Sequence, residues 1–285
     1  MARFASWRVR WGYLSIFLVA CFSLTHLSIA LWLVELSFEG ILAKQSQAGL
    51  WMISAVYLGM MVFNCFIEWF THRLLLHSKV VSWLSYLCDR HRNHHRLTAI
   101  KFKRIEDGSA MIKSVYPITQ DKQYESVSFP FYTLASFLAF LTIPLGLAQL
   151  IFPEAPFILG GYSAVATSFF FYEVIHPLEH KPDEWWEKRK NNPFLSLVWR
   201  VHQYHHLRSD YNMAIAGFFG LPLADMALGT FKLPKRPLQE AAITDEKELE
   251  PPKPIRLVVW IDSWSQNRAR RLFMEGVVSA ETVSE

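Results

Sequence analysis

Histidine is the residue whose number and spacing could do chemistry in this sequence. The chain has 285 residues and 11 His, and ten of the 11 fall in four short groups. Random placement at that frequency would rarely give even one such group. Imidazole nitrogen binds Zn, Cu, Fe and Ni in proteins. We therefore expect a metal centre with the ligands His72, His77, His91, His94, His95, His176, His180, His202, His205 and His206.

Two of the four groups have the spacing i, i+3, i+4, which places three side chains near one face of a helix. We expect each of these triplets to direct its three imidazoles at one point. A tetrahedral zinc site uses only three or four protein ligands, so ten imidazoles suit two metal ions. The triplets are His91, His94 and His95, and His202, His205 and His206.

The other two groups have spacings that a regular helix accommodates less simply. His72 and His77 are five residues apart, about 140° around an ideal helix, so both reach one centre only where the helix ends or distorts. His176 and His180 are an i, i+4 pair, but Pro177 disfavours helical geometry at the residue before it. We expect His176 at a helix end and His180 on the next turn.

Four carboxylates lie close to the histidine groups in the sequence, namely Glu68, Asp89, Glu173 and Glu179. A carboxylate can accept a hydrogen bond from the second ring nitrogen of a metal-bound histidine and so orient the ring. Ordinary polar residues at a membrane surface would give the same pattern. The eleventh histidine, His26, stands apart, and we interpret it as a polar residue inside a membrane helix.

Long apolar runs indicate membrane helices. Hydrophobic residues make up 52% of the chain, and four runs approach the roughly 20 residues that cross a bilayer. The runs are residues 13–36, 49–70, 130–152 and 156–174. The fourth, with Gly160 and Gly161, also fits a hairpin that does not fully cross. We expect an all-α integral membrane bundle of about four helices, with a cytoplasmic helical cap that carries the histidines.

Lys and Arg are distributed unevenly between the connections. Residues 71–129 contain ten, whereas residues 37–47 contain one and residues 153–155 none. Because cytoplasmic loops retain Lys and Arg, we expect both termini and the metal centre to be cytoplasmic. We favour a bacterial inner membrane over the endoplasmic reticulum. The net charge of +4 is spread along the chain, which argues against nucleic-acid binding.

The last residues differ in character from the rest. Prolines flank a charged stretch after residue 231. We therefore expect one membrane domain, residues 1–231, and a cytoplasmic surface tail, residues 232–285, with a short helix near residues 260–273. We interpret the polar stretch 101–128 as a solvated loop in preference to a lid or a partner-docking surface.

The histidine groups resemble the boxes of the fatty acid hydroxylase superfamily, which includes fatty acid 2-hydroxylases, sterol methyl oxidases and sterol desaturases. Residues 72–77 match the H-x4-H box, 91–95 the H-x2-HH box, 176–180 the H-x3-H box and 202–206 a second H-x2-HH box, in family order. The resemblance covers the chain from Glu68 to about Asp225. It implies that the ten histidines hold two iron ions, which zinc can replace in a purified protein. It also implies O2-dependent hydroxylation or desaturation of a membrane lipid, acyl chain or sterol-like substrate.

The resemblance is incomplete at two points. Pro177 stands in the third box, where fatty acid and ceramide members have aromatic or aliphatic residues, so the geometry of this box is in doubt. Four membrane segments leave no room for a cytochrome b5 module, which implies an external electron donor of the cytochrome b5, ferredoxin or reductase type. Carotenoid hydroxylases also use histidine boxes, but the spacing of their third box fits this sequence less well.

Two other classes of function stay open at the level of the sequence. One is a non-redox zinc-dependent enzyme acting on a membrane lipid, although no G-x-S-x-G or H-E-x-x-H motif is present. The other is a non-catalytic metal-binding or transport membrane protein, which would favour ionisable groups within the spans. The histidine groups lie outside the expected spans, which favours an enzyme at the interface. The sequence does not identify the lipid, the carbon that is attacked or the oligomeric state.

Overall fold

The computed structural model describes residues 2–120, 123, 127–130 and 132–283. Within these residues the chain is mostly helical, as expected, and it forms two compact units. The first unit combines residues 1–65, 129–176 and 216–220, and the second combines residues 66–128, 177–215 and 221–285. The sequence-based division at residue 231 stays a prediction.

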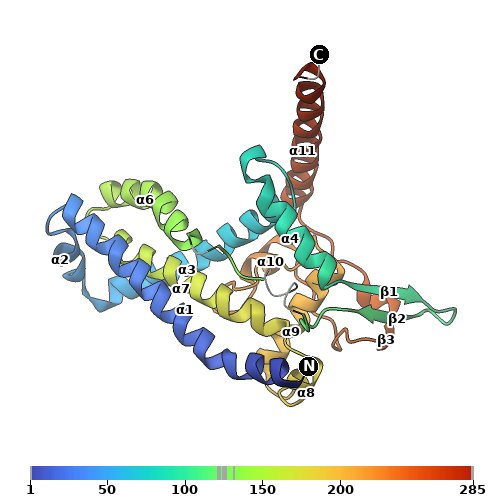
Figure 1. Cartoon of the computed structure of the whole chain (residues 1–285). Coiled ribbons are helices and arrows are strands. Elements are labelled where there is room, and N and C mark those ends of the chain that lie inside the picture. Colours follow the sequence, from blue (N-terminus) through green and yellow to red (C-terminus); the bar gives the residue numbers. More distant parts are fainter. Residues whose placement is uncertain (1, 121–122, 124–126, 131, 284–285) are drawn as a thin grey trace. The chain divides into compact units, whose positions relative to one another are not determined.

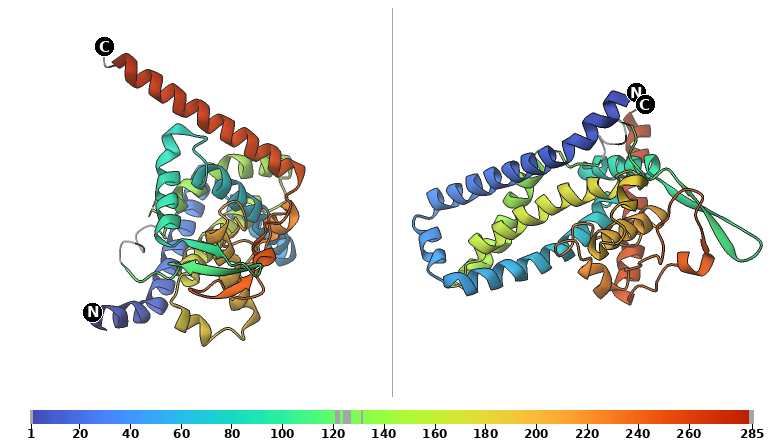
Figure 2. Two further views of the ribbon diagram at one scale, coloured as in Figure 1. Left: turned by 90° about the vertical axis from the view of Figure 1, so that its right-hand side faces the viewer. Right: turned by 90° about the horizontal axis from the view of Figure 1, so that it is seen from below.

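The first unit is a bundle of apolar helices. Its helices are α1 (Ala2–Ser37), α2 (Ile41–Ser46), α3 (Gly49–Thr71), α6 (Thr133–Ile151) and α7 (Phe157–Glu179) (Figures 1 and 2), the ends of α3 and α7 continuing into the second unit. Within the described residues, four helical segments are long and apolar enough to cross a membrane: 14–37, 49–76, 133–151 and 157–179. This confirms the expectation of about four membrane helices.

The candidate spans extend further than the apolar runs of the sequence suggested. The second span ends at Leu76 and the fourth at Glu179. His72 and His176 therefore lie in the last turns of these spans. The expectation that every histidine group lies outside the spans is wrong for these two residues, because each helix continues into its histidine box without a break in helical structure.

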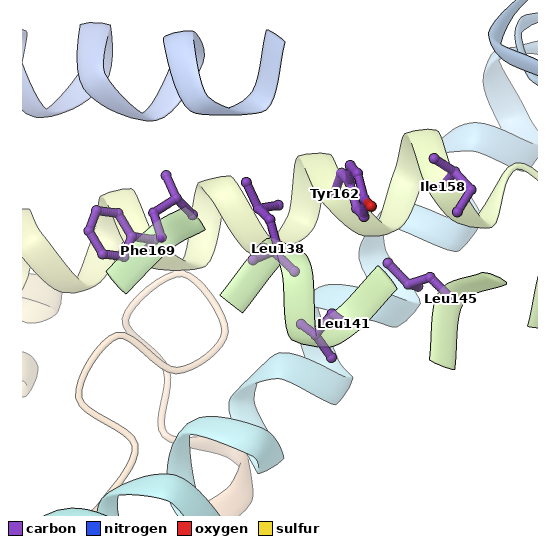
Figure 3. Packing of buried hydrophobic residues seen from close by; sticks show 8 residues of the cluster. Leu138, Leu141, Leu145, Ile158, Tyr162 and Phe169 are labelled. Atoms are coloured by element: carbon purple, nitrogen blue, oxygen red, sulfur yellow. The ribbon is translucent and has the colours of Figure 1, made fainter. Parts of the chain in front are cut away.

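Leucines of α6 and large side chains of α7 form the core of the bundle (Figure 3). Both helices contribute residues at the spacing i, i+4, i+7, i+11, which lines one face of a helix. These residues are Leu134, Leu138, Leu141 and Leu145 on α6, and Ile158, Tyr162, Val165 and Phe169 on α7. Phe22 and Leu27 of α1 pack against the same cluster.

Hydrogen bonds between polar side chains join α3 to α7 inside the bundle. Tyr57 Oη donates a hydrogen bond of 3.2 Å to Thr167 Oγ1, and Asn64 Nδ2 donates one of 3.2 Å to Ser168 Oγ. Hydrogen bonds of this kind contribute to the association of apolar helices, for which lipid offers little hydrophobic driving force.

Two glycines allow α7 to pack closely against its neighbours. A Cβ atom on Gly160 would lie 2.8 Å from Val56 Cγ1, and one on Gly161 would lie 2.6 Å from Leu145 Cδ2. The helix runs unbroken through both glycines and through Pro177, from Phe157 to Glu179. α7 is long and apolar enough to cross a membrane, and whether it crosses fully or forms part of a hairpin that does not stays a prediction.

The second unit contains several short helices and strands and one long helix, α11. Its helices are the π-helix η1 (His72–Leu76), the 3-10 helix η2 (Ser82–Leu84), α4 (Ser85–Leu97), α8 (Asp183–Glu187), α9 (Pro193–Leu207), α10 (Leu223–Leu228), the 3-10 helix η3 (Glu246–Leu249) and α11 (Arg256–Val283). Its strands are β1 (Ile100–Arg104), β2 (Ser109–Ser114) and β3 (Ile243–Asp245).

A three-stranded antiparallel sheet of order β1-β2-β3 corrects the all-α expectation. β1 and β2 form a hairpin in which Ile100 pairs with Ser114 and Arg104 with Ala110. The dipeptide Asp107-Gly108, with Gly108 at φ 81°, lies in the turn, where a positive φ favours glycine. The solvated-loop interpretation of residues 101–128 is therefore wrong over this hairpin.

The residues after 231 are more ordered than a surface tail would be. β3 pairs with β2, and Leu238 and Leu249 are buried. The helix expected near residues 260–273 is present as the longer α11.

Substituting Gly160 with alanine should destabilise the bundle. The added methyl group would overlap Val56, whose branched side chain has little freedom to move, and overpacking of this kind costs about 1–3 kcal/mol. The aggregation midpoint temperature of the protein in detergent should fall. Gly59→Ala on α3 is the matched control, because a Cβ atom there meets nothing within 4 Å. An unchanged midpoint for Gly160→Ala would contradict the close packing of α7 on α3.

Candidate metal centre

The structure brings the ten predicted histidines together in two groups of five, each of which could hold a metal ion. In each group the ligand atoms lie within 4.8 Å of one another. Site A consists of His72, His77, His91, His95 and His205, and site B of His94, His176, His180, His202 and His206.

The triplets are divided between the sites, which corrects the expectation that each triplet points at one centre. His91 and His95 belong to site A, whereas His94 belongs to site B. The physical reason is helical geometry, because i and i+4 differ by about 40° around the axis whereas i+3 lies about 60° away on the other side. In α9 the same division places His202 and His206 in site B and His205 in site A.

Nine of the ten histidines belong to the second unit. His176 is the last residue of the first unit, and α7 continues from it without a break to Glu179. His176 thus lies in the last turn of α7, as expected, and His180 directly follows the helix end, whereas Pro177 lies inside the helix and does not end it at His176.

A π-helical turn brings His72 and His77 into one site. η1 begins at His72, and the His77 backbone N–H donates to the His72 carbonyl at 3.0 Å, an i to i+5 bond. The two rings are stacked with centroids 5.0 Å apart. This is the helix distortion that the five-residue spacing required.

The Nε2 atoms of neighbouring rings face one another at hydrogen-bond distance. In site A the Nε2–Nε2 distances are 2.8 Å for His72–His91, 3.1 Å for His77–His91, 3.0 Å for His91–His95 and 3.4 Å for His77–His205. In site B they are 3.1 Å for His180–His202 and 3.1 Å for His202–His206.

These distances fit nitrogen atoms around a metal ion. Ligands about 2.0–2.1 Å from an ion, at angles between 90° and 109°, lie about 2.8–3.4 Å apart. A cation at the centre of each group would attract all of these nitrogens, whereas direct contact between two neutral rings requires one Nε2 of the pair to donate a proton. The donor set is entirely imidazole nitrogen, which suits Fe, Zn, Cu or Ni.

Backbone carbonyls hold the other ring nitrogen of four ligands. A carbonyl oxygen can only accept, so each Nδ1 carries the proton and Nε2 presents its lone pair to the site. The pairs are His72 Nδ1 with Met213 O at 2.6 Å, His180 Nδ1 with Tyr116 O at 3.0 Å, His205 Nδ1 with Tyr211 O at 2.8 Å and His206 Nδ1 with Thr98 O at 3.0 Å. The fold thereby fixes ring orientation independently of the metal.

Burial keeps these imidazoles neutral, which metal binding requires. Removal from water lowers the pKa of His180 to about 3 and that of His205 to about 4. The same cause lowers the pKa of His77, His91 and His206 well below the usual value, and neighbouring histidines lower it further.

Glu179 is a candidate carboxylate that lies beside a ligand. Glu179 Oε2 is 3.5 Å from His202 Nδ1, and both side chains are buried. Of the other three, Glu68 accepts from the Ile215 N–H, Glu173 accepts from the Phe129 N–H, and Asp89 pairs with Lys79.

Tyr116 is a neighbour of site B that sequence reasoning missed. Its fully buried ring lies 4.4 Å from the ring of His180 and 5.1 Å from that of His206, between centroids. Burial, together with the negative charges of Glu179 and Asp183, raises the pKa of its hydroxyl well above the usual value, so it stays protonated. No residue nearby in the sequence marks this position.

Asp225 is a second missed residue, and it supports site A. Its buried carboxylate accepts hydrogen bonds from Trp69 Nε1 (3.2 Å), Met213 N (2.9 Å), Ala214 N (2.8 Å) and Thr230 Oγ1 (2.6 Å). Met213 in turn accepts the His72 bond, so Asp225 positions His72 through one intervening residue. Burial raises the pKa of Asp225, and its four donors oppose that shift. Asp225 is the single charged residue in the apolar stretch 217–228, a signal that could have identified it.

Replacing Asp225 with asparagine should weaken metal binding at site A. The asparagine NH2 group would face the backbone N–H groups that now donate to the carboxylate. Met213 would lose its hydrogen bond, and the position of its carbonyl, which holds His72, would be disturbed. Loss of such an outer partner typically lowers metal affinity 10–100-fold. Metal content after dialysis against a chelator should fall from two ions per chain towards one.

The control for this substitution is Asp89→Asn, which removes an exposed carboxylate from the helix that carries His91 and should retain both ions. Thr230→Val removes one of the four hydrogen bonds and should give an intermediate loss even if Asp225→Asn misfolds. Full retention of metal by folded Asp225→Asn and by Thr230→Val would contradict the positioning role.

Comparison with known proteins returns no match for this chain. No protein-family model, no curated protein and no solved structure matches it. The features that bear on its function are therefore the two histidine sites and the four apolar helices.

Proposed function

We propose that this chain is a membrane lipid hydroxylase or desaturase of the fatty acid hydroxylase superfamily, in which ten histidines hold two iron ions. The observation that carries the proposal is the convergence of the Nε2 atoms, 2.8–3.4 Å apart in two buried groups. A single tetrahedral zinc ion would leave most of these nitrogens without a role.

The ligand set favours redox-active ions over structural ones. Structural zinc sites combine four Cys or His ligands, whereas each site here groups five histidines without a thiolate. When bound, iron would supply the O2 chemistry that an organic side chain cannot perform. This chain's own residues would hold the ions, keep the rings neutral and exclude water from the buried sites.

The overall reaction requires an external reductant. In hydroxylation, O2 takes two electrons from the C–H bond and two from the donor, and two protons complete one hydroxyl product and one water. In desaturation, two hydrogen atoms leave the substrate, the donor again supplies two electrons, and with two protons O2 becomes two waters. The donor would be a protein of the cytochrome b5, ferredoxin or reductase type.

The membrane helices support an apolar substrate. His72 and His176 lie in the last turns of two candidate spans, so a lipid or sterol-like molecule would approach the sites from the bilayer. Proximity and orientation would then select the C–H bond. We place the sites on the cytoplasmic face, with a bacterial inner membrane as the favoured location.

Lipid analysis of cells that express the chain tests this proposal. Extracts should contain a lipid that has gained one oxygen or lost two hydrogens, and its amount should depend on O2. His205→Ala in site A and His94→Ala in site B should each lower it more than about 100-fold, because loss of an outer partner alone costs 10–100-fold.

The control is His26→Ala, because the His26 ring bonds to the Phe22 carbonyl one turn earlier in the same helix. This variant should keep full activity. Equal product without O2, or full activity of a protein loaded with zinc alone, would contradict the oxygenase and favour a non-redox zinc enzyme.

A further inference from the structure

The first half of α11 has one face packed on the rest of the second unit, to which it belongs. Val258, Ile261 and Ser265 are 0%, 5% and 3% exposed, respectively. Their spacing i, i+3, i+7 places them on one side of the helix. This side fixes the rotation of α11 about its axis.

The neighbouring face of α11 is apolar and exposed. Leu257, Trp260 and Trp264 are 48%, 63% and 43% exposed. They also have the spacing i, i+3, i+7, so they form one stripe, here called the α11 stripe. Tryptophan is typical of the membrane–water interface, where its ring is half in the apolar layer and half in water.

A part-buried ion pair ties α11 to the end of a candidate membrane span. Arg73 Nε and Nη2 donate to the two carboxylate oxygens of Asp262, each at 2.6 Å. Arg73 is 5% exposed and lies in the last turn of the span that ends at Leu76. A two-bond arginine–carboxylate pair of this kind fixes geometry as well as distance.

The ion pair sets the depth of the stripe. Where the span from Gly49 to Leu76 crosses a bilayer, its last turn lies at the membrane surface. Asp262 must then lie there too, and Trp260 and Trp264 are two residues to either side of it.

The charge of α11 suits an anionic surface. After the stripe come Arg268, Arg270 and Arg271, and Asp262 is the sole acidic residue between positions 256 and 274. Because Asp262 is paired with Arg73, the outward charge of this segment is positive. Each basic residue near anionic headgroups adds to membrane attraction.

We propose that residues 257–271 of α11 form an interfacial helix that lies in the headgroup layer and binds anionic phospholipid. The α11 stripe inserts its tryptophans, and the arginines contact phosphate groups. Arg73 follows His72 directly, so this contact also links the membrane surface to the first histidine box.

Spin labels at single cysteines test the proposal in vesicles that contain phosphatidylglycerol. Cys21 is replaced by serine because it is exposed, whereas Cys65 and Cys88 are buried. Labels replace Trp260 and Trp264 on the stripe and, as a control, the exposed Gln266 on another side of the helix. The ratio of collisions with O2 to collisions with a water-soluble nickel complex should be several-fold higher at 260 and 264 than at 266.

A second arm tests the charge contribution. Replacing Arg268, Arg270 and Arg271 with glutamine, or using phosphatidylcholine vesicles alone, should reduce the difference between the stripe and position 266. Equal, water-like ratios at all three positions would overturn the proposal. So would spin–spin broadening at 260 that disappears on dilution with unlabelled protein, because a second copy would then lie against the stripe. These readouts do not require iron, so they succeed or fail separately from the proposed reaction.

Discussion

The rest of the structure depends on the convergence of imidazole nitrogens at two points. In six pairs of histidines the Nε2 atoms lie 2.8–3.4 Å apart. Burial lowers the pKa of His91 and His206 well below the usual value and so favours the neutral rings that metal binding requires. Each group of five histidines could hold one metal ion, which would draw its nitrogens together.

The rest of the fold holds the rings in place. Backbone carbonyls of Thr98, Tyr116, Tyr211 and Met213 accept from Nδ1 and thereby direct Nε2 at the sites. The π-helical turn that begins at His72 closes the five-residue gap to His77, and Asp225 fixes the loop that supplies the Met213 carbonyl. These features would organise each site before a metal arrives, which lowers the conformational cost of binding.

The sequence predicted the ten histidines and the four apolar helices because both are local patterns. The division of each triplet between two sites was missed although the spacing marks it, because i and i+4 lie about 40° apart around a helix and i+3 lies about 60° to the other side. The β1–β2 hairpin was missed although Asp107-Gly108 marks its turn, because the charged residues around it resembled a solvated loop. Asp225 and Tyr116 were missed because their contacts join residues that are distant in sequence. Asp225 accepts from the Met213 backbone N–H, and Tyr116 accepts from the His180 ring through its backbone carbonyl.

The most direct test of the central claim is X-ray absorption at the metal edge of the purified, iron-loaded protein, with the metal content measured on the same sample. The account predicts two iron atoms per chain, each surrounded by nitrogen or oxygen at about 2.0–2.2 Å, with the outer-shell scattering of several imidazoles. One metal atom per chain, or sulfur neighbours at about 2.3 Å, would contradict it.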